Sequence, residues 1–251
     1  MAFAHSAKVK LAREIAEMGG LVERQIGMAI DALATRDSGL ARRVIAADTT
    51  IDAMQRSVEA LAIETIVRRQ PVADDLRQVI AVLRIAAELE RTGDLAKNIS
   101  KRIVAISGED VPLASIRGMS HLATLILVQL HDVLDGFASR DAETAISVWL
   151  RDKDIDHLCT SLFQELLGRM MENSITMFLG AHLLFCTKNL ERMGDHATNI
   201  AEAIHYLVKG EILSGERPKA DLTSMLAVAL GENGHFRLRC SVARDGVAAA
   251  M

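Results

Sequence analysis

Two stretches of the chain carry nearly the same phrase: ELERTGDLAKNI at residues 88–99 and NLERMGDHATNI at residues 189–200. Both read Leu-Glu-Arg-x-Gly-Asp, and in both an asparagine follows the aspartate one helical turn later. Leu, Glu, Arg and Ala favour helices, and neither stretch contains proline. The repetition predicts that the two halves of the chain are copies of one helical unit.

The similarity between the halves extends beyond these phrases. ATRD at 34–37 matches ASRD at 138–141, and DTTID at 48–52 matches DKDID at 152–156, both at an offset of 104 residues, whereas the opening phrases match at 101. The second copy therefore lacks three residues between the two blocks. We place the deletion in a connection, at RMMENS (169–174), because a deletion inside a helix would rotate everything after it.

Composition favours an all-α fold, since half of the residues are apolar, only 3% are aromatic and three are proline. The pattern predicts helices at about 7–35, 40–69, 73–106, 113–137, 141–171 and 174–209, with Asp37-Ser38 and Asp141 as N-caps. Short connections make neighbouring helices antiparallel. We expect two tandem three-helix bundles related by an internal repeat, at 5–110 and 111–214, and a mobile tail at 215–251.

Charge and cysteine usage exclude several classes of protein. The net charge is −4 with acids and bases interspersed, which is unlike a basic nucleic-acid-binding surface. The three cysteines show no CxxC spacing and are typical of reduced thiols. The N-terminus lacks the apolar core of a signal peptide, and the longest apolar run, about 175–186, is too short to span a bilayer. We expect a soluble, cytoplasmic protein.

Acidic residues four positions apart share one face of a helix. The chain contains four such pairs, all at repeat-equivalent positions: Asp48 with Asp52, Glu90 with Asp94, Asp152 with Asp156, and Glu191 with Asp195. If the second and third helices of each copy pack side by side, four carboxylates converge there, and they need protons or cations. Oxygen ligands favour iron, manganese, magnesium or calcium, with zinc as a further candidate.

One competing interpretation and two further candidate ligands accompany this metal hypothesis. Asn98 and Asn199, one turn after the acids, are further candidate ligands, and a patch neutralised by shared protons or salt bridges is the competing interpretation. Glycine in both phrases, at a cost of about 1 kcal/mol in a helix, predicts close approach of backbone or ligand. His196 has Leu95 as its counterpart, so we expect it to be a polar surface or supporting residue.

At these residues the sequence resembles the PhoU family of bacterial phosphate-transport and phosphate-signalling regulators. The resemblance covers about residues 5–228 and includes RRQPVADDLR (68–77) and NLERMGDHATNIAEAI (189–204). It implies two three-helix bundles whose E(D)xxxD motifs bind multinuclear metal clusters, and these motifs fall on the four acid pairs. Residues 229–251 follow no pattern of that family.

The resemblance also implies a role and partners. It indicates a non-enzymatic regulator that restrains the phosphate-starvation response, acting on a sensor histidine kinase and on the ATPase subunit of the phosphate ABC transporter. It further implies a cytoplasmic homodimer that meets the membrane only through these partners and binds no nucleic acid.

The alternative class is a helical-bundle di-iron carboxylate enzyme or iron-storage protein. That class needs Glu-x-x-His on two helices, and we expect no such pair on these helices.

Overall fold

The computed structural model describes residues 2–213, 223, 226–230 and 236–240. Six long helices form its body: α1 (Ala2–Thr35), α2 (Ser38–Arg69), α3 (Asp74–Ala105), α4 (Leu113–Ser139), α5 (Ala142–Met171) and α6 (Met177–Lys209). The predicted helices are confirmed, with bounds that differ by a few residues. The predicted N-caps are also confirmed, since Asp37 accepts a hydrogen bond from the Leu40 amide and Asp141 from the Glu143 amide, both at 2.9 Å.

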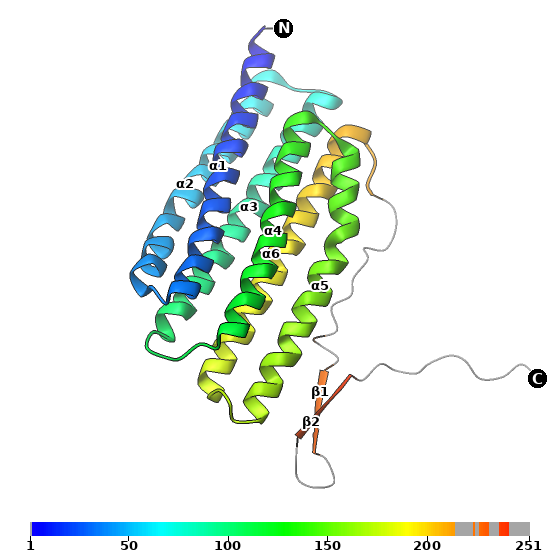
Figure 1. Cartoon of the computed structure of the whole chain (residues 1–251). Helices are drawn as coiled ribbons and strands as arrows, with labels where there is room; N and C mark the ends of the chain where they lie inside the picture. Colours follow the sequence, from blue (N-terminus) through cyan, green and yellow to red (C-terminus); the bar gives the residue numbers. More distant parts are fainter. Residues whose placement is uncertain (1, 214–222, 224–225, 231–235, 241–251) are drawn as a thin grey trace, which may run out of the picture.

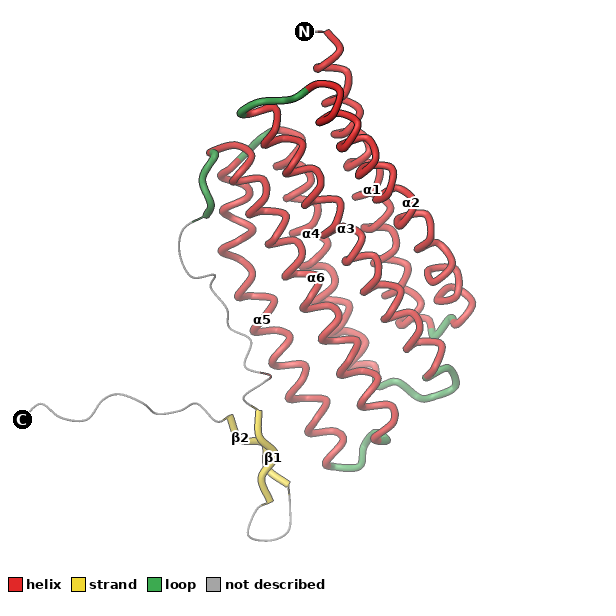
Figure 2. The backbone as a smooth tube through the Cα atoms, turned by 180° about the vertical axis from the view of Figure 1, so that it is seen from behind, coloured by secondary structure: helices red, strands yellow, loops and turns green. Residues whose placement is uncertain are grey.

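The helices form two three-helix bundles, α1–α3 and α4–α6, as the repeat predicts. In both views α2 and α5 lie at opposite outer edges, with the other four helices between them (Figures 1 and 2). The two bundles meet where α3 packs against α6 and α1 against α4. The buried apolar side chains of both copies belong to one continuous core, so neither copy has to be stable alone.

The helices at the junction between the copies run antiparallel. The guanidinium of Arg84, near the start of α3, lies over the ring of Tyr206, near the end of α6. At the other end, the Arg102 guanidinium lies 4.0 Å from the centroid of the Phe185 ring. This arrangement places the middle of α3, and its repeated phrase, beside the middle of α6.

Among the described helices, α4 is the one long and apolar enough to cross a membrane by length and composition, and the sequence analysis did not single it out. In the structure its apolar face packs into the core against α1, α5 and α6. The core helix of a helical bundle has the same length and composition as a membrane span, so α4 is accounted for by its packing.

Most of the expected tail at 215–251 lies outside the described residues. Within the described part, β1 (Leu226–Leu230) pairs antiparallel with β2 (Phe236–Cys240), with Leu226 opposite Cys240. This strand pair was not predicted from the sequence, because runs of five residues are too short to show a clear period. The available signal was the glycine-containing stretch GENGH between them.

Candidate metal centre

Four acidic side chains line the contact between α2 and α3, and we call them the first seam: Asp48, Asp52, Glu90 and Asp94. They lie close enough together to influence one another. Burial and the nearby charges of Asp94, Asp52 and Asp48 raise the pKa of Glu90 above its ordinary value. The structure therefore brings together the four residues that the spacing predicted for the first copy.

A lysine that was not among the predicted site residues lies in the first seam. Lys97 Nζ donates hydrogen bonds to Asp48 Oδ2, at 2.5 Å, and to Asp94. Although burial opposes the charge, these two hydrogen bonds raise the pKa of the Lys97 ammonium. The signal was present in the sequence, because Lys97 lies three residues after Asp94 and so on the same face of the helix.

The equivalent acids between α5 and α6 form the second seam: Asp152, Asp156, Glu191 and Asp195. This seam is more buried, since Asp152 and Asp156 are each 1% exposed and Glu191 is 4% exposed. The Thr198 hydroxyl on α6 donates to Asp152 Oδ1 on α5 at 3.1 Å. Lys188, one turn before Glu191, lies 3.1 Å from its carboxylate.

The repeated glycines explain how the helices of each seam come close. A Cβ added to Gly93 would lie 3.1 Å from Cδ1 of Ile51, and one added to Gly194 would lie 3.1 Å from Cδ1 of Ile155. These two isoleucines are themselves repeat equivalents, each one residue before an acid of its seam. The predicted close approach is thus between the glycine of the third helix of each repeat and an isoleucine of the second helix, joined at Gly93 by Gln25 Oε1 of α1 at 3.0 Å.

The two asparagines do not join the acids in the same way. Asn98 is exposed. Asn199 turns toward α3, where its amide nitrogen donates to Glu88 Oε2 at 2.9 Å. Asn199 therefore has a partner at the junction of the two copies, while its metal role stays a prediction.

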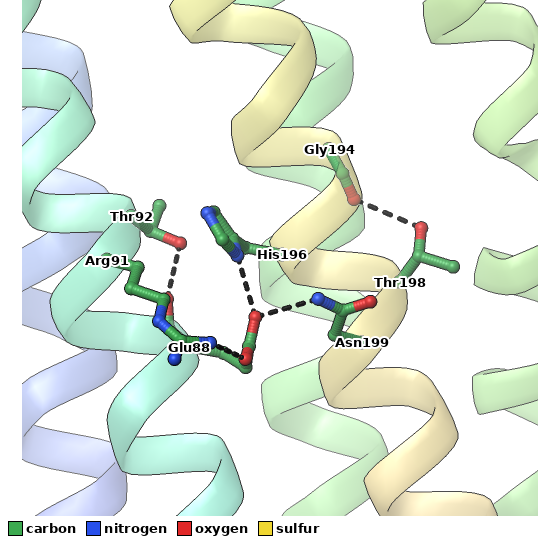
Figure 3. A network of polar contacts seen from close by, with 7 residues as sticks. All are labelled: Glu88, Arg91, Thr92, Gly194, His196, Thr198 and Asn199. Atoms are coloured by element: carbon green, nitrogen blue, oxygen red, sulfur yellow. Dashed lines mark hydrogen bonds and ion pairs between the residues drawn. The ribbon is translucent and has the colours of Figure 1, made fainter.

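Glu88 is the centre of a polar network that the sequence analysis missed (Figure 3). Its carboxylate lies 2.7 Å from His196 Nδ1 and 2.6 Å from the Arg91 guanidinium, in addition to the Asn199 contact. Burial raises the pKa of Glu88, but the hydrogen bonds from His196 and Asn199, together with Arg91, outweigh it and leave the pKa below its ordinary value. The network joins α3 to α6 and so holds the two copies together.

Whether a metal ion fits the seams depends on the number, charge and arrangement of their oxygen ligands. Each seam offers four carboxylates, of which one is buried in the first seam and three in the second, and buried carboxylates require a cation or a proton. As the side chains stand, no three His, Cys, Asp or Glu groups in the described part of the chain are gathered closely enough to hold a metal ion. In the first seam, Lys97 holds two of the carboxylates instead. The donor set fits a hard cation, provided that such contacts are exchanged.

A Glu-x-x-His pair does occur on α6, at Glu202 and His205, but it does not form a di-iron site with the seams. Glu202 accepts a hydrogen bond from the Trp149 indole at 3.1 Å, and His205 Nδ1 lies 3.1 Å from the Glu211 carbonyl oxygen. The equivalent positions on α3 are Lys101 and Val104. The di-iron alternative therefore has no paired motif on the third helices of the two copies.

Fold and site together define a class: a helical-bundle protein of two tandem repeats, with one acidic seam in each repeat. Comparison with known proteins then identifies the family. The family model for the PhoU domain matches residues 15–103 and again residues 119–204. The chain belongs to the PhoU family.

Relatives match over nearly their full length. A phosphate-specific transport system accessory protein PhoU homolog of Rhizobium meliloti is 51% identical over 216 residues, covering 86% of this chain and 91% of the relative. The corresponding protein of Caulobacter vibrioides is 44% identical, covering 85% and 93%. The crystal structure of PhoU from Pseudomonas aeruginosa has a TM-score of 0.79 at 34% identity, covering 82% of this chain and 99% of the other.

Proposed function

We propose that this chain is an accessory protein of the phosphate transport system, with a regulatory rather than an enzymatic role. The observation that carries the proposal is the match over both repeats to proteins named for that accessory role, at 51% and 44% identity to two of them. A related structure is named as the phosphate transport system regulatory protein PhoU from Streptococcus pneumoniae. Because the match covers about nine-tenths of the relatives' length, the whole accessory protein is being compared.

We further propose that the protein restrains the phosphate-starvation response when phosphate is plentiful. It acts as a cytoplasmic homodimer on the sensor histidine kinase of that response and on the ATPase subunit of the phosphate ABC transporter. It reaches the membrane only through these partners.

The proposal also includes metal binding at the two seams. The residues that would hold the metal are the eight acids, with Asn98 and Asn199 as further candidates, and iron, manganese, magnesium and zinc are the candidate ions. A bound cation would neutralise the clustered carboxylates and join the second and third helices of a repeat. What supports this is the burial of acids at equivalent positions, which is costly without a counter-charge.

The role is tested by deleting the gene in its host and assaying an enzyme induced by phosphate starvation, such as alkaline phosphatase, in cells grown with ample phosphate. We expect high activity in the deletion strain and low activity after complementation with the wild-type gene. Low activity in the deletion strain would overturn the regulatory role.

The contribution of the seams is tested in the same strain. We expect Asp94→Asn combined with Asp195→Asn to complement poorly, while Asp154→Asn complements fully. Asp154 is a matched control because it is an exposed acid on α5 between two acids of the second seam. Full complementation by the double variant would separate the regulatory role from the seams.

A further inference from the structure

The two seams differ at one equivalent position, occupied by Lys97 in the first copy and by Thr198 in the second. Lys97 extends from α3 so that its ammonium lies between the two helices, bonded to Asp48 of α2 and to Asp94 of its own helix. The Lys97 side chain is 22% exposed and that of Asp48 is 4% exposed. This ion pair is therefore largely withdrawn from water, where charges interact more strongly than at the surface.

In the second copy the same place holds a neutral group. Thr198 is fully buried, and its hydroxyl donates to Asp152, the equivalent of Asp48, at 3.1 Å. At the other end of the second seam, Lys188 Nζ lies 3.1 Å from the Glu191 carboxylate. Asp48 thus accepts a hydrogen bond from a charged ammonium, whereas its equivalent Asp152 accepts one from a neutral hydroxyl at this position.

We propose that Lys97 is a built-in counter-cation of the first seam, so that metal binding there is an exchange in which the ammonium leaves Asp48 and Asp94. This inference rests on the proposed metal binding. A cation that coordinates both carboxylates would lie within a few ångströms of the ammonium, where the two positive charges repel each other and compete for the same negative charge. Lys97 therefore weakens metal binding at the first seam and stabilises that seam when metal is absent.

A different result is expected if Lys97 only stabilises the packing of α2 against α3. Removing such a packing residue lowers stability with and without metal and leaves the affinity for metal unchanged or weaker. Removing a competing cation lowers the stability of the metal-free protein but strengthens metal binding. The direction of the change in affinity separates the two roles.

The experiment measures Mn²⁺ binding to the full chain, with Asp195→Asn present to weaken the second seam. Free Mn²⁺ is followed by electron paramagnetic resonance at fixed pH and ionic strength for this parent chain and for its Lys97→Thr and Lys97→Met variants. We expect the dissociation constant to fall about tenfold in both variants, the size expected when a charged hydrogen-bonding competitor is removed. Lys101→Thr is the control, since Lys101 is an exposed lysine one turn further along α3.

A second readout does not depend on metal. In the presence of chelator, Lys97→Met should melt at a lower temperature than the parent chain, and Mn²⁺ should raise its melting temperature more than that of the parent. Lys97→Met keeps the apolar stem of the side chain, so loss of packing is limited.

The possible outcomes distinguish failure of the counter-cation role of Lys97 from failure of the proposed metal binding. Equal or weaker Mn²⁺ affinity in the Lys97 variants would overturn the counter-cation role and leave metal binding intact. Absence of Mn²⁺ binding in every variant and in the wild-type chain would overturn metal binding itself, and the exchange with it.

Discussion

The first and second seams occupy equivalent places in the two repeats, yet they balance their charge differently. The first seam buries one of its four acids fully, Asp48, and holds it with the Lys97 ammonium. The second seam buries three acids, and the residue equivalent to Lys97 is a threonine. The acids, the glycines and the packing isoleucines recur in both copies, whereas the compensating groups do not. The repeat therefore preserves the acids, glycines and isoleucines, which we call the frame of the site, and varies the groups that compensate the acidic charge.

The largest effect is expected at the two isoleucines, and comparing them tests whether the frame is equivalent in the two seams. Ile51→Ala and Ile155→Ala each remove a buried side chain that packs against a motif glycine, at 2% and 1% exposure. We expect each to lower the free energy of unfolding by about 2–5 kcal/mol, as measured by denaturant titration. Ile63→Ala, at a position 59% exposed on α2, is the control and should change it little. A large cost at one isoleucine only would show that the seams do not share one frame.

The next effect concerns the junction, which has no symmetric counterpart because Glu88 corresponds to Asn189. Glu88→Ala leaves the partly buried His196 and Asn199, and the exposed Arg91, without their shared acceptor. We expect a loss of about 2–3 kcal/mol in unfolding free energy near neutral pH. Glu59→Ala, an exposed acid on α2, should cost under about 0.5 kcal/mol. Equal costs for the two would remove the network as a link between the copies.

A smaller effect addresses the neutral group of the second seam. Thr198→Val keeps the shape of the side chain but removes the hydroxyl, whose one proton has two acceptors, Asp152 Oδ1 and the Gly194 carbonyl oxygen one turn earlier. The expected cost is about 1–2 kcal/mol, because the acceptor is a buried carboxylate. Thr124→Val on α4 is the matched control, since its exposed hydroxyl bonds only the preceding turn of its own helix. A stabilising Thr198→Val would mean that this hydroxyl does not support Asp152.

The smallest effect reports on the second repeat alone. Both described free cysteines, Cys159 and Cys186, are buried in α5 and α6. Burial raises the pKa of the Cys186 thiol to about 12, so almost no thiolate exists at pH 8. We expect iodoacetamide to leave Cys186 unmodified in the native protein and to modify it after denaturation, as mapped by mass spectrometry. Rapid native modification would indicate that the second repeat opens independently of the first.

Much of the frame could be predicted from the sequence because its signals are local or repeated. The six helices follow from caps, connections and apolar period, and the convergence of the first seam follows from acids spaced one turn apart. Lys97 and Glu88 were missed for a different reason. Each has partners on another helix as well as on α3, and each has a different residue at the equivalent position, Thr198 and Asn189, so the comparison of the two repeats did not point to them.

The most direct test of the central idea, that the paired acids bind metal, is a metal count. Wild type, Asp94→Asn, Asp195→Asn and the double variant are purified without chelator, equilibrated with Mn²⁺ and analysed by elemental mass spectrometry, with Asp154→Asn as control. We predict that each single variant retains less metal than wild type, that the double variant retains least, and that Asp154→Asn matches wild type. Equal metal content in all five proteins would contradict the assignment of these carboxylates as ligands.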